Sequence, residues 1–335
     1  MMRRRWIAVA AALAVLTLAC GGGGGAGEAP SPAPSAGLLL YLEAFNNQVV
    51  ALDFASGAQR RLPPFSADTF VAAADCTPDG QTLALALLDI RQGRSQLRLM
   101  GGPWGDRTLD VEGQIGGVAF SPDGRRLAVS RLMMGQQEYS LWWLELASTT
   151  WQPSPALPGS VGSPRWSPAG DRIVFSLHRA GQTQIYVLDV KGGPPRQLTQ
   201  EGNSNTYPDW SPDASTIVYV GVDPSGLTSQ LFIMDADGEG ERQLTQGGRA
   251  KGFPRWSRDG KHLAYAGTLG PTISSIAPFR LPREVEAARP HNTAIFVANP
   301  DGSGERQLTS DDLDAFPLAW CLPGPWLDQG WEGGP

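Results

Sequence analysis

The sequence contains few of the side chains on which metal-dependent and acid–base catalysis usually depend. Its 335 residues include only three His, three Cys and three Lys. His178, His262 and His291 are far apart and lack the short spacing that is typical of metal ligands. The G-x-S-x-G motif, which carries the nucleophile of many hydrolases, is absent. We therefore predict no catalytic residues, no metal site and no cofactor.

Clustered positive charge and long apolar runs are also lacking. The formal net charge is −6, and no run of three Lys or Arg occurs beyond Arg5. Because nucleic-acid binding neutralises phosphates with clustered Lys and Arg, a nucleic-acid partner is not expected. The apolar run Trp6 to Ala19 has 14 residues, which is too short to span a bilayer comfortably.

The beginning of the sequence has the features of a targeting signal. Arg3 to Arg5 precede the apolar run, which ends in Leu16-Thr17-Leu18-Ala19-Cys20. This ending resembles the lipobox of bacterial lipoproteins, although Thr17 stands where Leu is commonest. The resemblance implies that residues 1–19 are a signal peptide and that Cys20 is lipidated. The alternative is an ordinary secretory signal with an incidental Cys. Residues 20–37, rich in Gly and Pro, would then be a tether.

Gly and Pro, by contrast, are abundant. The 41 Gly and 28 Pro disfavour a bundle of long helices, because both residues weaken helix interiors. A hydrophobic fraction of 41% and 11 Trp disfavour disorder for most of the chain. The composition therefore predicts a folded protein with many turns.

One turn motif recurs six times, and Phe120-Ser121-Pro122-Asp123-Gly124 is a complete copy. The copies begin at Cys76, Phe120, Trp166, Trp210, Trp256 and Trp320. They are 44 to 46 residues apart, except for a last interval of 64. Pro presets φ for the turn, Asp accepts hydrogen bonds from nearby backbone amides, and Gly adopts positive φ. Ala214 replaces this Gly in one copy, so we expect strain there.

The segments between the turns predict four short antiparallel strands in each repeat. An apolar run follows each turn, and a second run follows a polar loop. A third, shorter run reads Arg-Gln-Leu-Thr at residues 196–199, 242–245 and 306–309. Four strands in about 45 residues are typical of a β-propeller blade. The motif resembles the TolB-like propeller repeat, and the resemblance covers residues 38–324.

The strand count predicts how the ring closes. Residues 38–62 supply three strands that have no first strand before them, and residues 316–320 supply a first strand with no others after it. Together they make one blade. We therefore predict an all-β fold, a six-bladed β-propeller of four-stranded antiparallel blades closed by the N-terminal strands and a C-terminal strand. Residues 325–335 would form a tail. The expected propeller differs from TolB, since no N-terminal α/β domain stands between tether and first blade.

The repeat aromatics and two Cys have structural interpretations. We expect Trp166, Trp210 and Trp256 to pack between neighbouring blades. Cys76 and Cys321 fall on the first strands of the first and last blades, which are neighbours in a closed ring. A disulfide between them and a pair of buried free thiols are both open.

Three charged residues directly precede the repeat aromatic in successive blades. Arg165, Asp209 and Arg255 give the order positive, negative, positive. One hypothesis is ion pairing between blades, and the other is a polar ring near the channel mouth that binds a ligand.

The long last interval indicates an insertion, Thr268 to Asn292, between the second and third strands of a blade. Connections of this kind share a face with the loops that lead into the next blade. Loops positioned by a rigid scaffold often carry function. The candidate partner contacts are Phe253, Phe279, Arg280, Arg283 and Phe316. The alternative is a loop elaboration without function.

These features predict a non-enzymatic, lipid-anchored lipoprotein of the cell envelope, facing the periplasm or the exterior. We expect a monomer that binds a protein or peptide partner on the face of the insertion and meets the membrane through its lipid. The alternatives are a glycan-processing enzyme similar to polysaccharide lyases, which needs His, Lys or Tyr clustered around the axis, and a small-ligand sensor.

Overall fold

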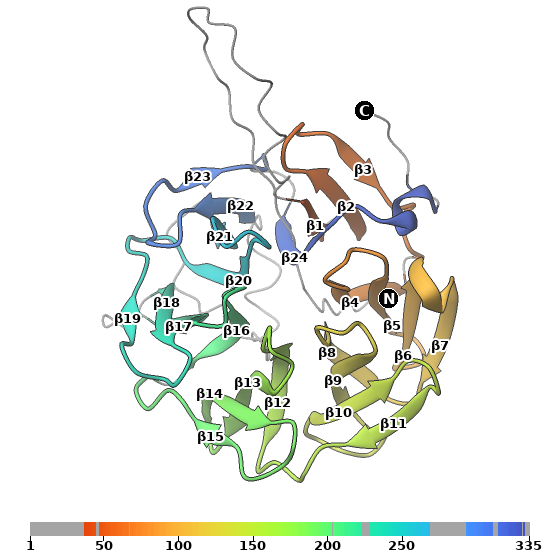
Figure 1. Ribbon diagram of the computed structural model, residues 1–335, viewed down its shortest axis with the longest axis horizontal. Coiled ribbons are helices and arrows are strands. Elements are labelled where there is room, and N and C mark those ends of the chain that lie inside the picture. The colour runs from red at the N-terminus through yellow and green to blue at the C-terminus, as the bar shows by residue number, and fades with distance from the viewer. Residues whose placement is uncertain are drawn as a thin grey trace, which may run out of the picture.

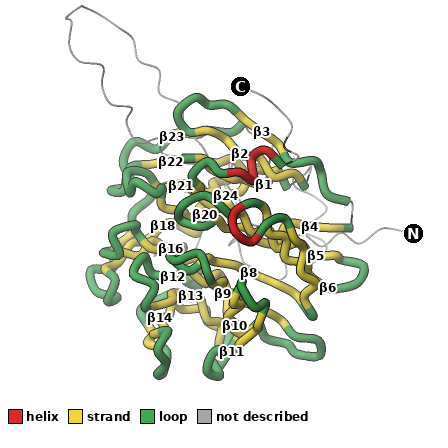
Figure 2. Tube along the Cα trace, turned by 45° about the vertical axis from the view of Figure 1, so that its right-hand side comes forward, coloured by secondary structure: helices red, strands yellow, loops and turns green. Residues whose placement is uncertain are grey.

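Strands dominate the structure. The computed structural model describes residues 37–44, 47–66, 68–202, 204–222, 228–268, 293–310, 314–329 and 331. These residues form 24 β-strands, arranged as a ring of six four-stranded sheets around a central axis (Figure 1). Helix is limited to the 3-10 segments η1 (Gly102–Trp104) and η2 (Pro325–Asp328), drawn in red in Figure 2. The predicted six-bladed propeller is confirmed.

Each blade is an antiparallel meander whose first strand lies nearest the axis. The first three blades are β4 (Thr69–Cys76), β5 (Leu83–Asp89), β6 (Arg94–Met100), β7 (Arg107–Val111); β8 (Gln114–Phe120), β9 (Arg126–Leu132), β10 (Ser140–Glu145), β11 (Thr150–Pro153); and β12 (Ser160–Trp166), β13 (Arg172–Arg179), β14 (Gln182–Asp189), β15 (Arg196–Gln197). The next two are β16 (Thr206–Trp210), β17 (Thr216–Val222), β18 (Ser229–Asp235), β19 (Arg242–Gln243); and β20 (Lys251–Trp256), β21 (Leu263–Thr268), β22 (Thr293–Ala298), β23 (Arg306–Gln307).

The sixth blade joins the two ends of the chain, as predicted. It has the strand order β24 (Ala315–Cys321), β1 (Leu38–Glu43), β2 (Gln48–Asp53) and β3 (Gln59–Arg61). In Figure 1 the blue strand β24 lies at the centre of the ring beside β1. Six residue pairs, from Leu38 with Cys321 to Glu43 with Ala315, join the two strands. The ring is therefore closed by backbone hydrogen bonds between its first and last strands.

The recurrent turn has the conformation that its residues predict. In blade 1 the Gly80 N–H donates to the Thr77 carbonyl at 2.9 Å, and Asp79 Oδ1 accepts from the Thr77 hydroxyl at 2.6 Å. In blades 1, 2, 3 and 5 the Gly of the turn has φ between 67° and 73°, and Ala214 in blade 4 has φ 61°. Because an L side chain is disfavoured in this region, the expected strain at Ala214 is confirmed. Gly324, in the copy that begins at Trp320, is extended with φ −151°, so this last copy does not form the turn.

The Arg-Gln-Leu-Thr segment has a structural role. In blade 4 the Thr245 hydroxyl accepts from the Leu231 N–H at 3.0 Å and donates to the Gln230 side chain at 2.9 Å. The Gln243 amide donates to the Thr245 carbonyl at 2.7 Å. Only two residue pairs join β19 to β18 in the strand ladder. The side-chain hydrogen bonds of the motif therefore help to hold this short outer strand against its neighbour.

Side chains between adjacent sheets form the core. Trp166, Trp210 and Trp256 are 7%, 5% and 9% exposed and pack among aliphatic side chains of the preceding blade. The expected packing between blades is confirmed. Cys76 and Cys321 form a disulfide that joins β4 to β24, with 5.8 Å between their Cα atoms.

The two faces of the ring carry different connections. Lys251 at the start of β20 pairs with Gly267 near the end of β21, so each first strand begins where the second strand ends. The connection from β21 to β22 therefore leaves from the same face as the loops that enter the first strands. We call this the loop face and the opposite side, with the recurrent turns, the turn face.

Candidate functional site

The innermost strands are distorted near the loop face. In every blade the register between the first and second strands shifts by a bulge. Next to this bulge Ser163, Tyr207 and Phe253 have φ of 47°, 53° and 55°. Such conformations cost about 1–2 kcal/mol for residues other than Gly, and bulges re-aim side chains at functional sites. The distortion therefore lies at the loop-face end of the innermost strands, where the side chains of several blades approach one another.

Three aromatic side chains from successive blades meet there. The Tyr207 and Phe253 ring centroids are 4.1 Å apart, and those of Phe253 and Phe316 are 5.7 Å apart with an edge-to-face geometry. Phe253 is only 3% exposed, whereas Tyr207 and Phe316 are partly exposed. We call these three residues the aromatic cluster. Its ring contacts join β16, β20 and β24, with Phe253 buried between the two partly exposed rings.

The other side of the ring has small side chains at the corresponding position. Three residues before the repeat aromatic, β8 carries Gly117 and β12 carries Ser163, where β16 and β20 carry Tyr207 and Phe253. At this repeat position the innermost strands therefore carry aromatic side chains in blades 4 and 5 and small residues in blades 2 and 3.

A layer of charged side chains lies one step further along the same strands. Arg165 Nε and Asp209 Oδ1 are 3.5 Å apart, and both side chains are less than 15% exposed. Asp209 Oδ2 also accepts the Trp256 N–H at 2.8 Å. Arg255 Nε donates to the Leu318 carbonyl at 3.1 Å, and Asp75 Oδ2 accepts the Phe120 N–H at 2.7 Å. We call Asp75, Arg165, Asp209 and Arg255 the polar layer.

Burial dominates the electrostatics of this layer. It raises the pKa of Asp209 above its ordinary value, while Arg255 and Arg165 act in the opposite direction. Burial also lowers the pKa of Arg255, as does the positive charge of Arg165, and Asp209 and Asp75 oppose this shift. The formal charges of the two Asp and the two Arg in the polar layer thus sum to zero, and their contacts join neighbouring blades.

The structure places the candidate residues as follows. Phe253 and Phe316 belong to the aromatic cluster, and Arg165, Asp209 and Arg255 belong to the polar layer. Arg165 and Asp209 pair across neighbouring blades, as one of the two hypotheses for these residues has it. Three candidates of the insertion and the lipidation site, Phe279, Arg280, Arg283 and Cys20, lie outside the described residues.

Two residues of the site were not among the candidates. Tyr207 has the same spacing from Trp210 as Phe253 has from Trp256, so a position-by-position alignment of the repeats identifies it. Asp75 directly precedes the first residue of the recurrent motif, as Arg165, Asp209 and Arg255 do. In blade 1 this first residue is Cys76 and not an aromatic residue, so Asp75 was not recognised.

Two further titratable side chains, His178 and Lys251, have partners of their own. His178 is exposed on β13 and contacts the Thr183 hydroxyl, and Lys251 pairs with Glu305 at 2.9 Å. Within the part of the chain that is described, no three His, Cys, Asp or Glu are grouped so that they could hold a metal ion. The same residues contain no helix long and apolar enough to cross a membrane.

Comparison with known proteins agrees with the repeat and the ring. Residues 117–281 match the family model described as the TolB beta propeller domain. The chain carries a TolB-like β-propeller. The crystal structure of TolB from Acinetobacter baumannii has a TM-score of 0.66 to this TolB-like propeller at 20% identity, and the match covers 86% of this chain and 67% of that one. At this identity the likeness shows the fold.

Two curated relatives match shorter stretches of the TolB-like propeller. The Tol-Pal system protein TolB of Anaeromyxobacter dehalogenans (strain 2CP-C) is 31% identical over 138 residues, 38% of this chain and 30% of that protein. A Bacillus subtilis (strain 168) protein named "Uncharacterized peptidase YuxL" is 33% identical over 106 residues, 30% of this chain and 16% of that protein. The chain thus spans less than a third of the length of either relative.

Proposed function

We propose that this protein is a lipid-anchored, non-enzymatic TolB-like propeller of the cell envelope, and that it binds a protein or peptide partner at the aromatic cluster. The observation that carries the proposal is the joining of Tyr207, Phe253 and Phe316 across three blades at the loop face. Aromatic side chains dominate the energetics of protein interfaces, because they bury a large area with little loss of conformational freedom.

The backbone supports this interpretation. Tyr207 and Phe253 adopt positive φ at a bulge, as Ser163 does at the equivalent position of blade 3, so the bulge of the repeat sets the direction in which these aromatic side chains leave the strand. Both follow loops that a rigid ring holds in place, which is a common arrangement of binding sites. A partner segment with an apolar side chain would therefore contact Tyr207 and Phe316, the partly exposed members.

The anchor is the second part of the proposal. Cys20 follows a lipobox-like sequence, and the Gly- and Pro-rich residues 21–37 would hold the propeller away from the headgroups. Growth of the native host with an alkyne analogue of palmitate tests this part. We expect label on the wild-type chain and none on Cys20→Ala, which should leave the membrane fraction. Equal labelling of the two chains would refute the anchor.

Site-specific photocrosslinking in the native envelope tests the binding site. A photoreactive residue at Phe316 on the loop face is compared with one at Ala169, an exposed turn residue on the opposite face. We expect a discrete crosslinked species from position 316 only. Replacing Tyr207 by Ala should reduce its yield about tenfold or more, as for an interface hot spot. The same species from position 169, or a yield that does not depend on Tyr207, would contradict the assignment of the site.

A further inference from the structure

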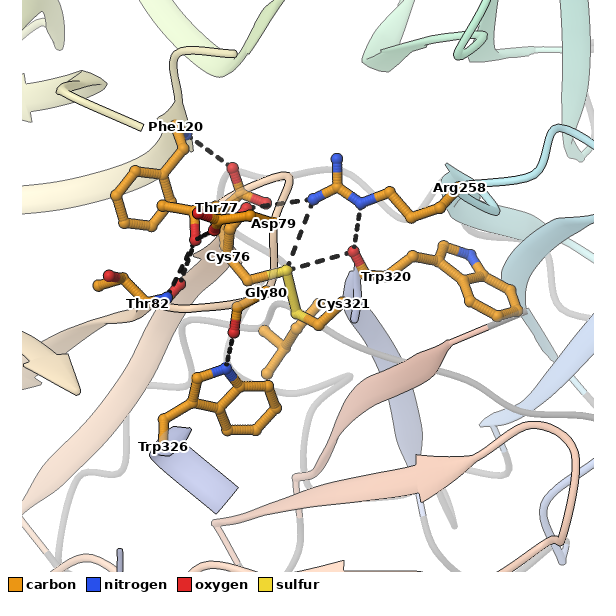
Figure 3. The surroundings of a disulfide bond; sticks show 12 residues. Cys76, Thr77, Asp79, Gly80, Thr82, Phe120, Arg258, Trp320, Cys321 and Trp326 are labelled. Atoms are coloured by element: carbon orange, nitrogen blue, oxygen red, sulfur yellow. Dashed lines mark hydrogen bonds between the residues drawn. A yellow bond between two sulfur atoms is a disulfide. The ribbon is translucent and has the colours of Figure 1, made fainter. Parts of the chain in front are cut away.

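Arg258 is an exception in the repeat. The turns of blades 1 to 4 have Pro at this place, namely Pro78, Pro122, Pro168 and Pro212. Arg258 extends from its turn to the closure of the ring (Figure 3). Its Nε donates to the Trp320 carbonyl at 3.0 Å, and its Nη2 donates to the Cys76 carbonyl at 3.1 Å. One cationic side chain thus contacts the first strand of blade 1 and the closing strand together.

The same guanidinium lies beside the disulfide. Its Nη2 is 3.6 Å from Cys76 Sγ, and Cys76 Sγ is 3.2 Å from the Trp320 carbonyl oxygen. Figure 3 shows the guanidinium and this carbonyl on the same side of the disulfide. Cys76 and Cys321 are 1% and 0% exposed. A neighbouring Arg stabilises a thiolate and so makes that sulfur the better leaving group in thiol–disulfide exchange. A static crosslink has no need of such a neighbour.

The strand that the disulfide holds is also part of the candidate site. Phe316 of the aromatic cluster lies on β24, and the Leu318 carbonyl of β24 accepts the hydrogen bond from Arg255. Cys321 ends this strand. A change at the disulfide can therefore be transmitted along β24 to the channel mouth over a few residues.

We propose that the Cys76–Cys321 disulfide is a redox-controlled latch on β24, and that its reduction by a dithiol loosens this strand and alters the aromatic cluster. Only the consequence for partner binding rests on the proposed function. The opening of the latch is independent of it.

The exchange takes place in two balanced steps. One thiolate of the dithiol attacks Cys321 Sγ, so that a mixed disulfide forms, the Cys76–Cys321 bond breaks, and Cys76 leaves as a thiolate beside Arg258. The second thiol of the reductant then loses its proton, and the resulting thiolate attacks the reductant's first sulfur, which is bonded to Cys321 Sγ in the mixed disulfide. This releases the Cys321 thiolate, which takes up that proton. The dithiol gives up two electrons and becomes a cyclic disulfide. Because both Cys are buried, attack follows local opening of the end of β24.

Hydrogen exchange of the full chain, oxidised or treated with dithiothreitol, tests the latch directly. We expect amide exchange in residues 315–321 to become about tenfold or more faster after reduction, as for local opening. The strands β12 and β13 on the other side of the ring serve as the internal reference: an increase that they share with β24 reports the lower global stability of the reduced chain, and only the excess in β24 reports the latch. Unchanged exchange in β24, or an equal increase in the reference strands, would overturn the latch.

Two substitutions test the role of Arg258. Arg258→Pro restores the residue of the other turns, and Arg258→Lys keeps the positive charge. In reduced chains at neutral pH, Cys76 should react with iodoacetamide about tenfold more slowly in Arg258→Pro than in wild type, with most of the rate restored in Arg258→Lys. Cys321 reactivity in the same samples reports any general change of access. Equal Cys76 rates in all three chains would remove Arg258 from the mechanism.

The coupling to the site has its own readout. Photocrosslinking from position 316 is compared between wild type and the double variant Cys76→Ser/Cys321→Ser, which is permanently open. We expect the open form to give a crosslinking yield at least about fivefold lower than wild type, because a loosened β24 must be ordered when the partner binds. Equal yields would overturn the coupling. If wild type gives no crosslink at all, the proposed function has failed, and hydrogen exchange still decides the latch.

Discussion

Single residues of the repeat are exchangeable when a neighbouring residue makes the same contact. In blade 3 Ala169 replaces the turn Asp, and the Ser167 hydroxyl donates instead to Asp171 at 2.7 Å. In blade 5 Arg258 replaces the turn Pro and gains hydrogen bonds to two other blades. Ala214 is different, because its backbone keeps the Gly conformation with φ 61°. An uncompensated replacement of this kind should be measurable as lost stability.

Ala214→Gly should therefore increase the free energy of unfolding. Gly removes the steric cost of positive φ but adds entropy to the unfolded chain, so we expect a net gain of about 0.5–1 kcal/mol. Urea unfolding followed by Trp fluorescence measures it. Ala169→Gly is the matched control, since Ala169 lies in an equivalent turn outside the left-handed region and should lose stability. A change in the same direction in both variants would show that the positive φ of Ala214 carries no steric cost.

Turn carboxylates predict a contribution to acid unfolding. The Ser211 hydroxyl, the Ser215 N–H and the Ser215 hydroxyl all donate to Asp213 and hold its pKa below the ordinary value. A carboxyl group with a lowered folded pKa stabilises the fold above about pH 4, and the contribution is lost as pH falls through the folded pKa.

Asp213→Asn should thus cost at most about 1 kcal/mol at pH 7, because the group is largely exposed and screened. Urea unfolding at pH 7 and at pH 3 measures the difference from wild type at each pH. The two chains should approach each other at the lower pH. A difference that is the same at both pH values would show that the charge of Asp213 contributes nothing.

At the scale of the strand, the features that follow from a repeated local motif can be predicted from the sequence, whereas contacts between distant blades cannot. The strands and turns were predictable because Pro, Asp and Gly act locally. Phe253 and Phe316 could be selected from their loops, but their contact with Tyr207 depends on bulges that no short motif encodes. The partners of Arg258 are 62 and 182 residues away, so the chain alone gives no sign of them. The polar layer was partly found, since three of its members directly precede a repeat Trp.

Asp209 is the residue on which the cohesion of the innermost strands should depend most. It pairs with Arg165 of β12 and accepts the Trp256 N–H of β20. Asp209→Ala leaves the Arg165 charge without its partner and should cost about 3 kcal/mol. Asp209→Asn retains an acceptor for the Trp256 N–H and should cost less. Urea unfolding of both variants measures these losses, and equal losses would assign the whole effect to the ion pair.

At the scale of the whole molecule, the ring is a linear array with a single closure. Every other blade is continuous in sequence, whereas the sixth combines β24 with β1 to β3. This arrangement was predictable from counting strands at the two ends. The partners of the closing side chains were not, because Trp326 Nε1, Arg258 and the Cys pair meet near Gly80 and Cys76 only in the folded ring.

The disulfide should therefore dominate the stability of the closure. It crosslinks residues 245 positions apart, and the loop-entropy model gives a stabilisation of about 5 kcal/mol for a loop of this size. Cys76→Ser, Cys321→Ser and the double variant should lose nearly the same amount, since either substitution removes the crosslink. The urea m-value should rise in all three, because the unfolded chain without the crosslink exposes more surface. A loss confined to one single variant, with an unchanged m-value, would instead attribute the effect to local packing around that sulfur.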